Sequence, residues 1–402
     1  MRRVTLPEAV RVLPADDPAA LGGILGDAHV VAIGENDHGV REFGAWRERL
    51  VRHLVRERGF GVVALESGFA EGALVDDRVR GGPGVWEDLA RDGFTFRAGD
   101  AAPVRAVVEG LREHRAAGGR ARFVGLDVPG SGGSPEPALR RIRDHLAVHA
   151  PGAVPLVDAA LEATAPYASA NNGVAPQRYA ALDGPARDRA TAALSRVRTR
   201  VEALGPGHRV ARHLAAGALR LDEQLREFDV LFAPDPPSRT VSSRDVHMAE
   251  TVALVRELAG PDERIVLLMH NGHAQRVPFT FLPGVSAPSA GTYLAETYGD
   301  DYVVLGLTAL AGSTPALALD DGARHGFTSH PEPLPDPAPG SIEAAVLEAG
   351  LGAEPVVLDL RAARDADPGG PTGIRHATTH VPVDVTAGYD AVLCLPTQSA
   401  SD

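Results

Sequence analysis

Residues 29–39, HVVAIGENDHG, decide how the rest of the chain is interpreted. The first half is a continuous apolar run, and the second half is a glycine-flanked turn carrying two carboxylates and a histidine. Similar apolar runs recur, with helical patterns between them, at residues 62–66, 123–127, 265–270, 302–307, 355–358 and 391–395. Continuous runs are typical of strands covered on both faces, and strands alternating with helices form right-handed βαβ units. We therefore predict an α/β fold with a mainly parallel central sheet flanked by helices.

Three segments are expected within this fold. Residues 1–135 form the N-terminal part of the α/β core, and residues 236–402 form its C-terminal part. Residues 136–235 lack a convincing strand and are rich in Ala, Arg and Leu, so we expect a helical insertion that forms one side of a deep cleft. Amphipathic patterns predict one helix at 41–58 and another capped by Ser242 or Ser243. The proline-rich segment 327–340 is expected to be a surface loop.

Composition excludes several classes of protein. With 40 Lys and Arg against 53 Asp and Glu, the net charge of −13 disfavours nucleic acid and anionic membranes as partners. No apolar run approaches the roughly 18 residues of a transmembrane helix, and no secretory signal is recognised, so a cytoplasmic protein is expected. The single cysteine, Cys394, excludes an internal disulfide and a cysteine-based zinc site, and it is expected to be buried in a strand.

Chemistry is expected at one edge of the sheet, because ligands of open parallel sheets bind beyond the carboxyl ends of the strands. The polar residues that follow four successive predicted strands are Glu35 with His38, then Glu66, then Asp127, then His270 with Asn271 and His273. A histidine can take a proton from water near neutral pH, and a neighbouring carboxylate fixes its tautomer. The pattern predicts an acid/base site.

These residues also have structural interpretations. Glu35 can cap the following helix, His38 can be a surface loop residue, Glu66 can pair with Arg47, Asp127 can begin a turn, and His270 and His273 can bond to loop backbone. A metal held by His38, Glu35, Glu66 and His270 or His273 is compatible with the ligand preferences of zinc. His247 is expected to be exposed, and His376 and His380 are expected to lie in a polar tail segment away from the site.

The motifs resemble those of the erythromycin esterase family. They run in order along nearly the whole chain, and the resemblance is weakest between about 136 and 235. The motifs are IGENDHGVREF at 33–43, VALE at 63–66, FVGLD at 123–127, SRD at 243–245 with MAE at 248–250, MHNGHA at 269–274, GTYL at 291–294, YGDDY at 298–302, GLT at 306–308 and YDA at 389–391.

The resemblance implies an α/β core with a helical part, and hydrolysis of macrolide lactones. It makes His38 the general base and assigns Glu35, Arg47, Glu66, His270 and His273 to the cleft. Distant relatives of this fold bind haem or metals. The family usually has a small hydroxyl residue before the histidine, whereas this chain has Asp37, which puts the macrolide substrate in doubt more than the acid/base chemistry.

Our prediction is a carboxylic ester hydrolase that cleaves an ester or lactone of a macrolide-like or other natural product, with a possible part in antibiotic resistance. No G-x-S-x-G motif is present, so we expect water activated by His38, no serine nucleophile and no cofactor. Substrate-binding roles are expected for Asp37, Asp127, Arg244 and Asn271. The alternatives are cyclisation or elimination in natural-product biosynthesis, and a metal- or haem-binding protein. The oligomeric state is left open.

Overall fold

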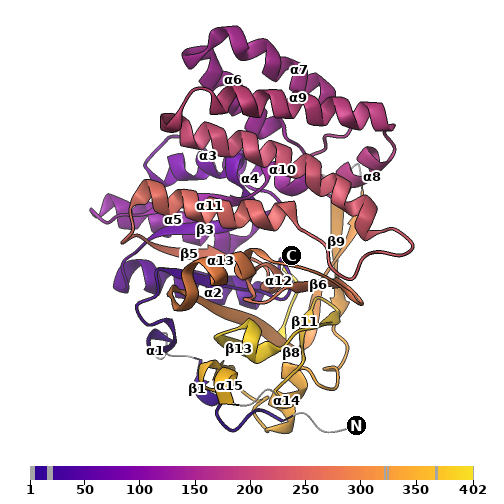
Figure 1. Ribbon diagram of the computed structural model, residues 1–402. Coiled ribbons are helices and arrows are strands. Elements are labelled where there is room, and N and C mark those ends of the chain that lie inside the picture. The colour runs from indigo at the N-terminus through magenta and orange to yellow at the C-terminus, as the bar shows by residue number, and fades with distance from the viewer. Residues whose placement is uncertain (1–4, 16–20, 321–322, 324–325, 367–369, 402) are drawn as a thin grey trace.

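The computed structural model describes residues 5–15, 21–320, 323, 326–366 and 370–401. Its centre is a sheet with helices on both faces, and a stack of helices lies at one end of the molecule (Figure 1). Within the described residues, no helix is both long and apolar enough to cross a membrane.

The strands are short except for β3 and β8. They are β1 (Arg11–Pro14), β2 (Val30–Ile33), β3 (Phe60–Gly68), β4 (Arg122–Asp127), β5 (Arg264–Leu268), β6 (Phe279–Leu282), β7 (Val285–Ala287), β8 (Tyr302–Leu319), β9 (Phe327–Pro333), β10 (Val356–Asp359), β11 (Gly373–His376), β12 (Thr379–Pro382) and β13 (Ala391–Gln398).

In the part of the chain that the structure describes, the helices include five short 3-10 turns. The α-helices are α1 (Gly22–Leu25), α2 (Arg41–Glu57), α3 (Phe69–Val79), α4 (Trp86–Asp92), α5 (Ala102–Ala116), α6 (Glu136–His149), α7 (Val154–Thr164), α8 (Ala175–Ala180), α9 (Gly184–Glu202), α10 (Arg209–Leu231), α11 (Ser243–Ala259), α12 (Asn271–Ala274), α13 (Ala290–Tyr298), α14 (Ile342–Glu348), α15 (Arg361–Ala366) and α16 (Val385–Gly388). The 3-10 turns are η1 (Ala98–Asp100), η2 (Pro129–Gly132), η3 (Pro151–Ala153), η4 (Pro206–His208) and η5 (Gly299–Asp301).

The central sheet has the order β1-β10-β13-β8-β2-β5-β3-β4. Every neighbouring pair from β13 to β4 is parallel, whereas β1 and β10 pair antiparallel at one edge. The predicted fold class, a mainly parallel sheet flanked by helices, is therefore confirmed. All seven predicted strands are present, and Cys394 is buried in β13 as expected.

Alternate residues of β2 serve two cores, because successive side chains of a strand point to opposite faces. Val31 and Ile33 join the cluster that includes Phe43 and Leu50 of α2. Val30 and Ala32 join the cluster that includes α11 and α14. The sequence of this strand is apolar throughout because both faces are buried.

The segment between β4 and α11 contains only helices within the described residues, and it forms the stack at the top of Figure 1. Helices α6, α7, α9 and α10 bury an apolar cluster of their own, which includes Leu139, Ile142, Leu146, Val157 and Leu194. The domain boundaries at 135/136 and 235/236 stay a prediction.

The expectation of a surface loop at 327–340 is wrong for its first half. Residues 327–333 form β9, which pairs antiparallel with the second half of β8. Pro331 and Pro333 are two residues apart, so their missing N–H groups fall on the same side of the strand. Because β8 is the only strand among the described residues that pairs with β9, that side can face outward, and an edge strand tolerates proline there.

Candidate active site

Four neighbouring parallel strands deliver the candidate residues to one edge of the sheet. Glu35 and His38 follow β2, His270 follows β5, and Asp127 ends β4. Glu66 lies within β3, where the register with β4 shifts between Leu65 and Gly68. Such a bulge re-aims a side chain. The carboxylate of Glu66 thereby comes to lie 3.6 Å from the ring of His38.

His38 lies between two carboxylates. Its Nδ1 hydrogen-bonds Glu35 Oε1 at 2.8 Å, and its Nε2 lies 3.6 Å from Glu66 Oε1. Because a carboxylate only accepts, Nδ1 carries the proton and Nε2 is left for chemistry in the neutral ring. The side chain is 38% exposed, so solvent reaches it, whereas Glu35 and Glu66 are buried.

The electrostatics of the site favour a proton on His38. Burial opposes the charged imidazolium, but Glu66 and Glu35 outweigh burial and raise the pKa of His38 to about 10. Burial also raises the pKa of both carboxyls, yet the net shift is downward, through Arg47 and His38 for Glu35 and through His273, His38 and Arg244 for Glu66. Both carboxylates are therefore ionised around neutral pH.

Arg47 of α2 is held beneath Glu35. Its Nη1 lies 2.5 Å from Glu35 Oε1, and its Nη2 donates to the carbonyls of Ile33 and Met269. The alternative pairing of Glu66 with Arg47 is wrong: Glu66 pairs with Arg244. The guanidinium of Arg47 is buried and engaged on two sides, which fits a residue that positions Glu35.

Arg244, at the start of α11, bridges the carboxylates of Glu66 and Asp127. Its Nη2 donates to Glu66 Oε1 at 2.8 Å and to Asp127 Oδ2 at 2.7 Å, and its Nε donates to Asp127 Oδ1 at 2.9 Å. Asp127 is fully buried and also accepts the N–H of Val128. Ser242 caps α11, as predicted, by accepting the N–H of Asp245.

The two histidines after β5 differ in their bonding. His270 accepts the N–H of Gly272 at Nδ1, so its Nε2 donates to the carbonyl of Asn36 at 2.8 Å. Burial, reinforced by the nearby rings of His376 and His38, holds the pKa of His270 well below its usual value, so this ring is neutral. Both of its nitrogens are used within the protein.

His273, like His38, lies between two carboxylates. Its Nδ1 hydrogen-bonds Asp245 at 2.7 Å, and its Nε2 lies 3.5 Å from Glu66 Oε1. Burial opposes the charged ring, but Asp245 and Glu66 raise the pKa of His273 overall. Asp245, which the sequence marks only as part of the SRD motif, therefore belongs to the hydrogen-bonded network that includes His273 and Glu66.

Asp37 and Asn271 are committed to backbone and side-chain bonds. Asp37 accepts the N–H of His38 and the hydroxyl of Thr314, which ties the turn to β8. Asn271 is buried, donates to the carbonyl of Leu307 and accepts its N–H. A Cβ on Gly34 would lie 2.0 Å from Asn271 Oδ1, so glycine is required there.

A cavity of about 1390 Å³, including space open to solvent, lies in front of His38. Its polar lining includes Glu35, Asp37, Arg47 and Glu66, whereas His270, His273, Asp127, Arg244 and Asn271 lie outside the lining. The remaining walls come from α2, the segment around η1, α5, and the β8–β9 hairpin, and their apolar members include Leu65, Phe96, Val104, Phe123, Leu268, Pro315, Leu317 and Phe327. The helical segment 136–235, expected along one side of the cleft, contributes no residue to this lining; it reaches the hairpin through Asn171, whose amide donates to Gly326.

Sequence reasoning missed Phe96 and Arg97, which line the cavity. Their φ angles of 53° and 59° lie in the left-handed region, which consecutive non-glycine residues rarely share. The ring of Phe96 lies 5.5 Å from that of His38, and the guanidinium of Arg97 lies 6.0 Å from the ring of Phe327. No motif marks them in the sequence.

The predicted positions of His376 and His247 are wrong. His376, on β11, lies beside the site, with its ring 4.3 Å from that of His270. His247 is buried rather than exposed, and it stacks on His213 of α10 at 4.3 Å. Helix α11 lies between α10 and β4, so a position that looks solvent-facing on a lone helix is covered.

A metal at His38 would meet a crowded donor set. The carboxylates beside the ring are already paired with Arg47 and Arg244, whose positive charge opposes a cation there. Within the described residues, three histidines with ligand atoms mutually within 4.8 Å gather elsewhere, on α6 and η4.

Comparison with known proteins gives a consistent result. A sequence profile described as "Erythromycin esterase" matches residues 55–397. Erythromycin esterase type II of Escherichia coli is 26% identical over 397 residues, covering 96% of this chain and 94% of the relative. Erythromycin esterase type I of Escherichia coli is 25% identical over 390 residues, covering 93% and 92%. A solved mutant of the erythromycin esterase EreC, in its open conformation, shares the fold with a TM-score of 0.81 at 21% identity, covering 96% of this chain and 94% of that one.

Proposed function

Because this chain belongs to the erythromycin esterase family and is therefore an esterase, we propose that it opens an ester or lactone of a macrolide-like or other natural product with water activated by His38. The observation that carries this proposal is the partly exposed imidazole at the cavity floor, held at Nδ1 by Glu35.

The lining of the cavity suits a mainly apolar substrate, because apolar side chains predominate among the walls. The two relatives from Escherichia coli are named for erythromycin, a macrolide, and a macrocyclic lactone has the apolar character that such walls accept. Cleavage of a macrolide by this chain would also confer resistance to it.

The proposed reaction consumes one water. His38 Nε2 takes a proton from water as the oxygen attacks the carbonyl carbon, and the imidazolium then returns that proton to the departing alkoxide. Glu35 stabilises the imidazolium and fixes the ring. Arg97 lines the same cavity together with its ion-pair partner Asp100, and its guanidinium is the cation we assign to the carbonyl oxygen.

The remaining polar residues of the site act as positioning residues in this proposal. Arg47 holds Glu35. Arg244 and Asp127 hold Glu66, and His270 donates to the backbone of the turn that carries His38. His273 and Asp245 complete the charge balance around Glu66.

A panel of macrolides and small lactones, followed by mass spectrometry, tests the reaction. We expect each accepted substrate to gain the mass of one water, without an acyl adduct on the intact protein and without a pre-steady-state burst. Ser329 and Ser401 line the cavity, and replacing either with alanine is expected to preserve turnover. A product of unchanged mass, or an adduct on either serine, would contradict direct hydrolysis.

A second candidate is cyclisation or elimination with the same residues. It is favoured by Asp37, a carboxyl next to His38 that lines the cavity and whose pKa is raised by burial. The product masses from the same panel distinguish it, because neither reaction adds water.

The pH dependence tests which form of His38 is active. A general base must be neutral, so kcat/KM is expected to rise with pH up to about 10, the pKa of His38. Glu66→Gln removes one of the two charges that raise this pKa, so the rising limb should move to lower pH by about 1–3 units.

Glu48→Gln is the matched control, because Glu48 lines the same cavity but pairs with Arg52. The rising limb of its kcat/KM profile should stay at the same pH as in the unchanged protein. A rate that falls as pH rises through about 10 would instead make imidazolium the active form and would rule out His38 as the base.

A further inference from the structure

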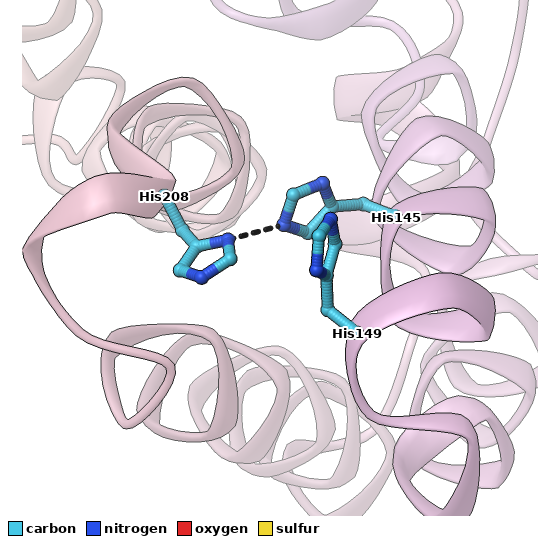
Figure 2. Close-up of side chains that lie close together, drawn as sticks. All are labelled: His145, His149 and His208. Atoms are coloured by element: carbon cyan, nitrogen blue, oxygen red, sulfur yellow. Dashed lines mark hydrogen bonds between the residues drawn. The ribbon is translucent and has the colours of Figure 1, made fainter.

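Three histidines of the helical segment lie close together. They come from two elements, neither of which contributes to the active site at the sheet edge. His145 and His149 lie one turn apart on α6, and His208 ends η4, just before α10 (Figure 2). Their ligand atoms all lie within 4.8 Å of one another, and the ring centroids are 4.4–5.0 Å apart. From this geometry we propose that the cluster binds a divalent transition-metal cation, with Zn²⁺ as the probe of choice.

The spacing suits chelation. Histidines at positions i and i+4 project from the same face of a helix, as paired zinc ligands do in helical metal sites. His145 Nε2 and His208 Nδ1 are 2.9 Å apart. With metal–nitrogen bonds of about 2.1 Å, two ligands are about 3.0 Å apart at a right angle and about 3.4 Å apart at the tetrahedral angle. This hydrogen-bonded pair needs to open by only a few tenths of an ångström, whereas the wider separations, up to 4.8 Å, have to close.

The cluster has room for an ion and its water. A cavity of about 660 Å³, including space open to solvent, is lined by His145, His208 and Gly207. Three imidazoles leave at least one coordination position open, and that position can be filled from this cavity. His149 is exposed, so an ion enters without unfolding the segment.

Two arginines in the same lining limit the affinity. Arg141 donates to the carbonyl of Ala70, and Arg209 pairs with Glu257 at 3.1 Å, so each is turned to another partner. The positive charge of these two guanidinium groups nevertheless opposes the binding of a metal cation beside them. We therefore expect weaker binding than at a cysteine-rich structural zinc site.

A bound ion would act as a clip. It would join the C-terminal end of α6 to the start of α10, and closing a long loop in this way stabilises the folded segment. The inference does not rest on the proposed function, because the two cavities share no lining residue.

Zinc titration of the metal-stripped full-length protein by calorimetry tests the inference. We expect one Zn²⁺ per chain and a Tm that rises with the logarithm of the zinc concentration. His149→Ala should weaken binding by at least about tenfold, since it removes a ligand. His145→Ala with His149→Ala should abolish binding. Cobalt substitution should give a visible absorption band that the double variant lacks.

His114→Ala is the matched control, since it removes a half-buried histidine of α5 outside the cluster. Its zinc affinity should equal that of the unchanged protein, and so should that of His38→Gln. Equal affinities in His149→Ala and His114→Ala would overturn the proposal. Loss of the zinc in His38→Gln alone would overturn it too, by placing the ion at the sheet edge.

Discussion

Replacing His38 with glutamine is expected to lower kcat/KM for any accepted ester by about 10³-fold, the middle of the range for acid/base groups. Glutamine keeps a polar side chain of similar reach, yet it cannot take a proton from water. The partners on both sides of the ring, Glu35 and Glu66, remain in place, so the loss reports on proton transfer. Steady-state kinetics at several pH values measures it.

The control for this variant is His53→Gln, a change in a half-buried histidine of α2. Its kcat/KM should stay within about twofold of the unchanged protein, since surface substitutions have small effects. The substitution also removes a pH-dependent contribution to the stability of the fold. The raised pKa of His38 means that its ion pairs stabilise the fold below about pH 6.5 and that this contribution is lost as pH rises through about 10. His38→Gln that retains full activity would remove the assignment of the base.

The strands and their shared edge could be predicted from the sequence because burial on both faces leaves a local mark. β2 is apolar throughout, β13 is apolar from Ala391 to Leu395, and β5 is apolar after Arg264. In a parallel sheet every carboxyl end falls on the same side, so a shared edge for Glu35, Glu66 and Asp127 follows without knowing the strand order, whereas their clustering depends on β2, β5, β3 and β4 being neighbours.

The partners within the site could not be predicted, because they depend on how separate elements meet. Arg244 reaches Asp127 across 117 residues of sequence, and only the packing of α11 against β4 brings them together. Likewise, Arg47 pairs with Glu35 rather than Glu66 because of where α2 crosses the sheet edge. β9 was missed because prolines usually exclude a strand, an argument that fails at an edge.

Arg244→Met is expected to destabilise the protein by about 3–5 kcal/mol, the usual cost of removing one partner from a buried ion pair. Methionine fills similar space but leaves Asp127 fully buried, with the Val128 N–H as its remaining hydrogen bond among the described contacts. Urea denaturation at neutral pH measures the loss. Arg140→Met is the control, since its exposed pair with Glu136 should contribute at most about 1 kcal/mol.

The same variant carries a pH signature that separates lost charge pairing from lost packing. Arg244 helps to hold the pKa of Glu66 well below its usual value, so this pairing stabilises the fold above the unfolded pKa of about 4.3 and weakens as pH falls further. The gap in stability between Arg244→Met and the unchanged protein should therefore stay nearly constant from pH 7 to about 5 and narrow as the pH falls below about 4. Adding Asp127→Asn should recover part of the stability, because a neutral amide costs less to bury than an unpaired carboxylate. A gap that is independent of pH and that Asp127→Asn does not reduce would mean that Arg244 stabilises the fold by packing alone.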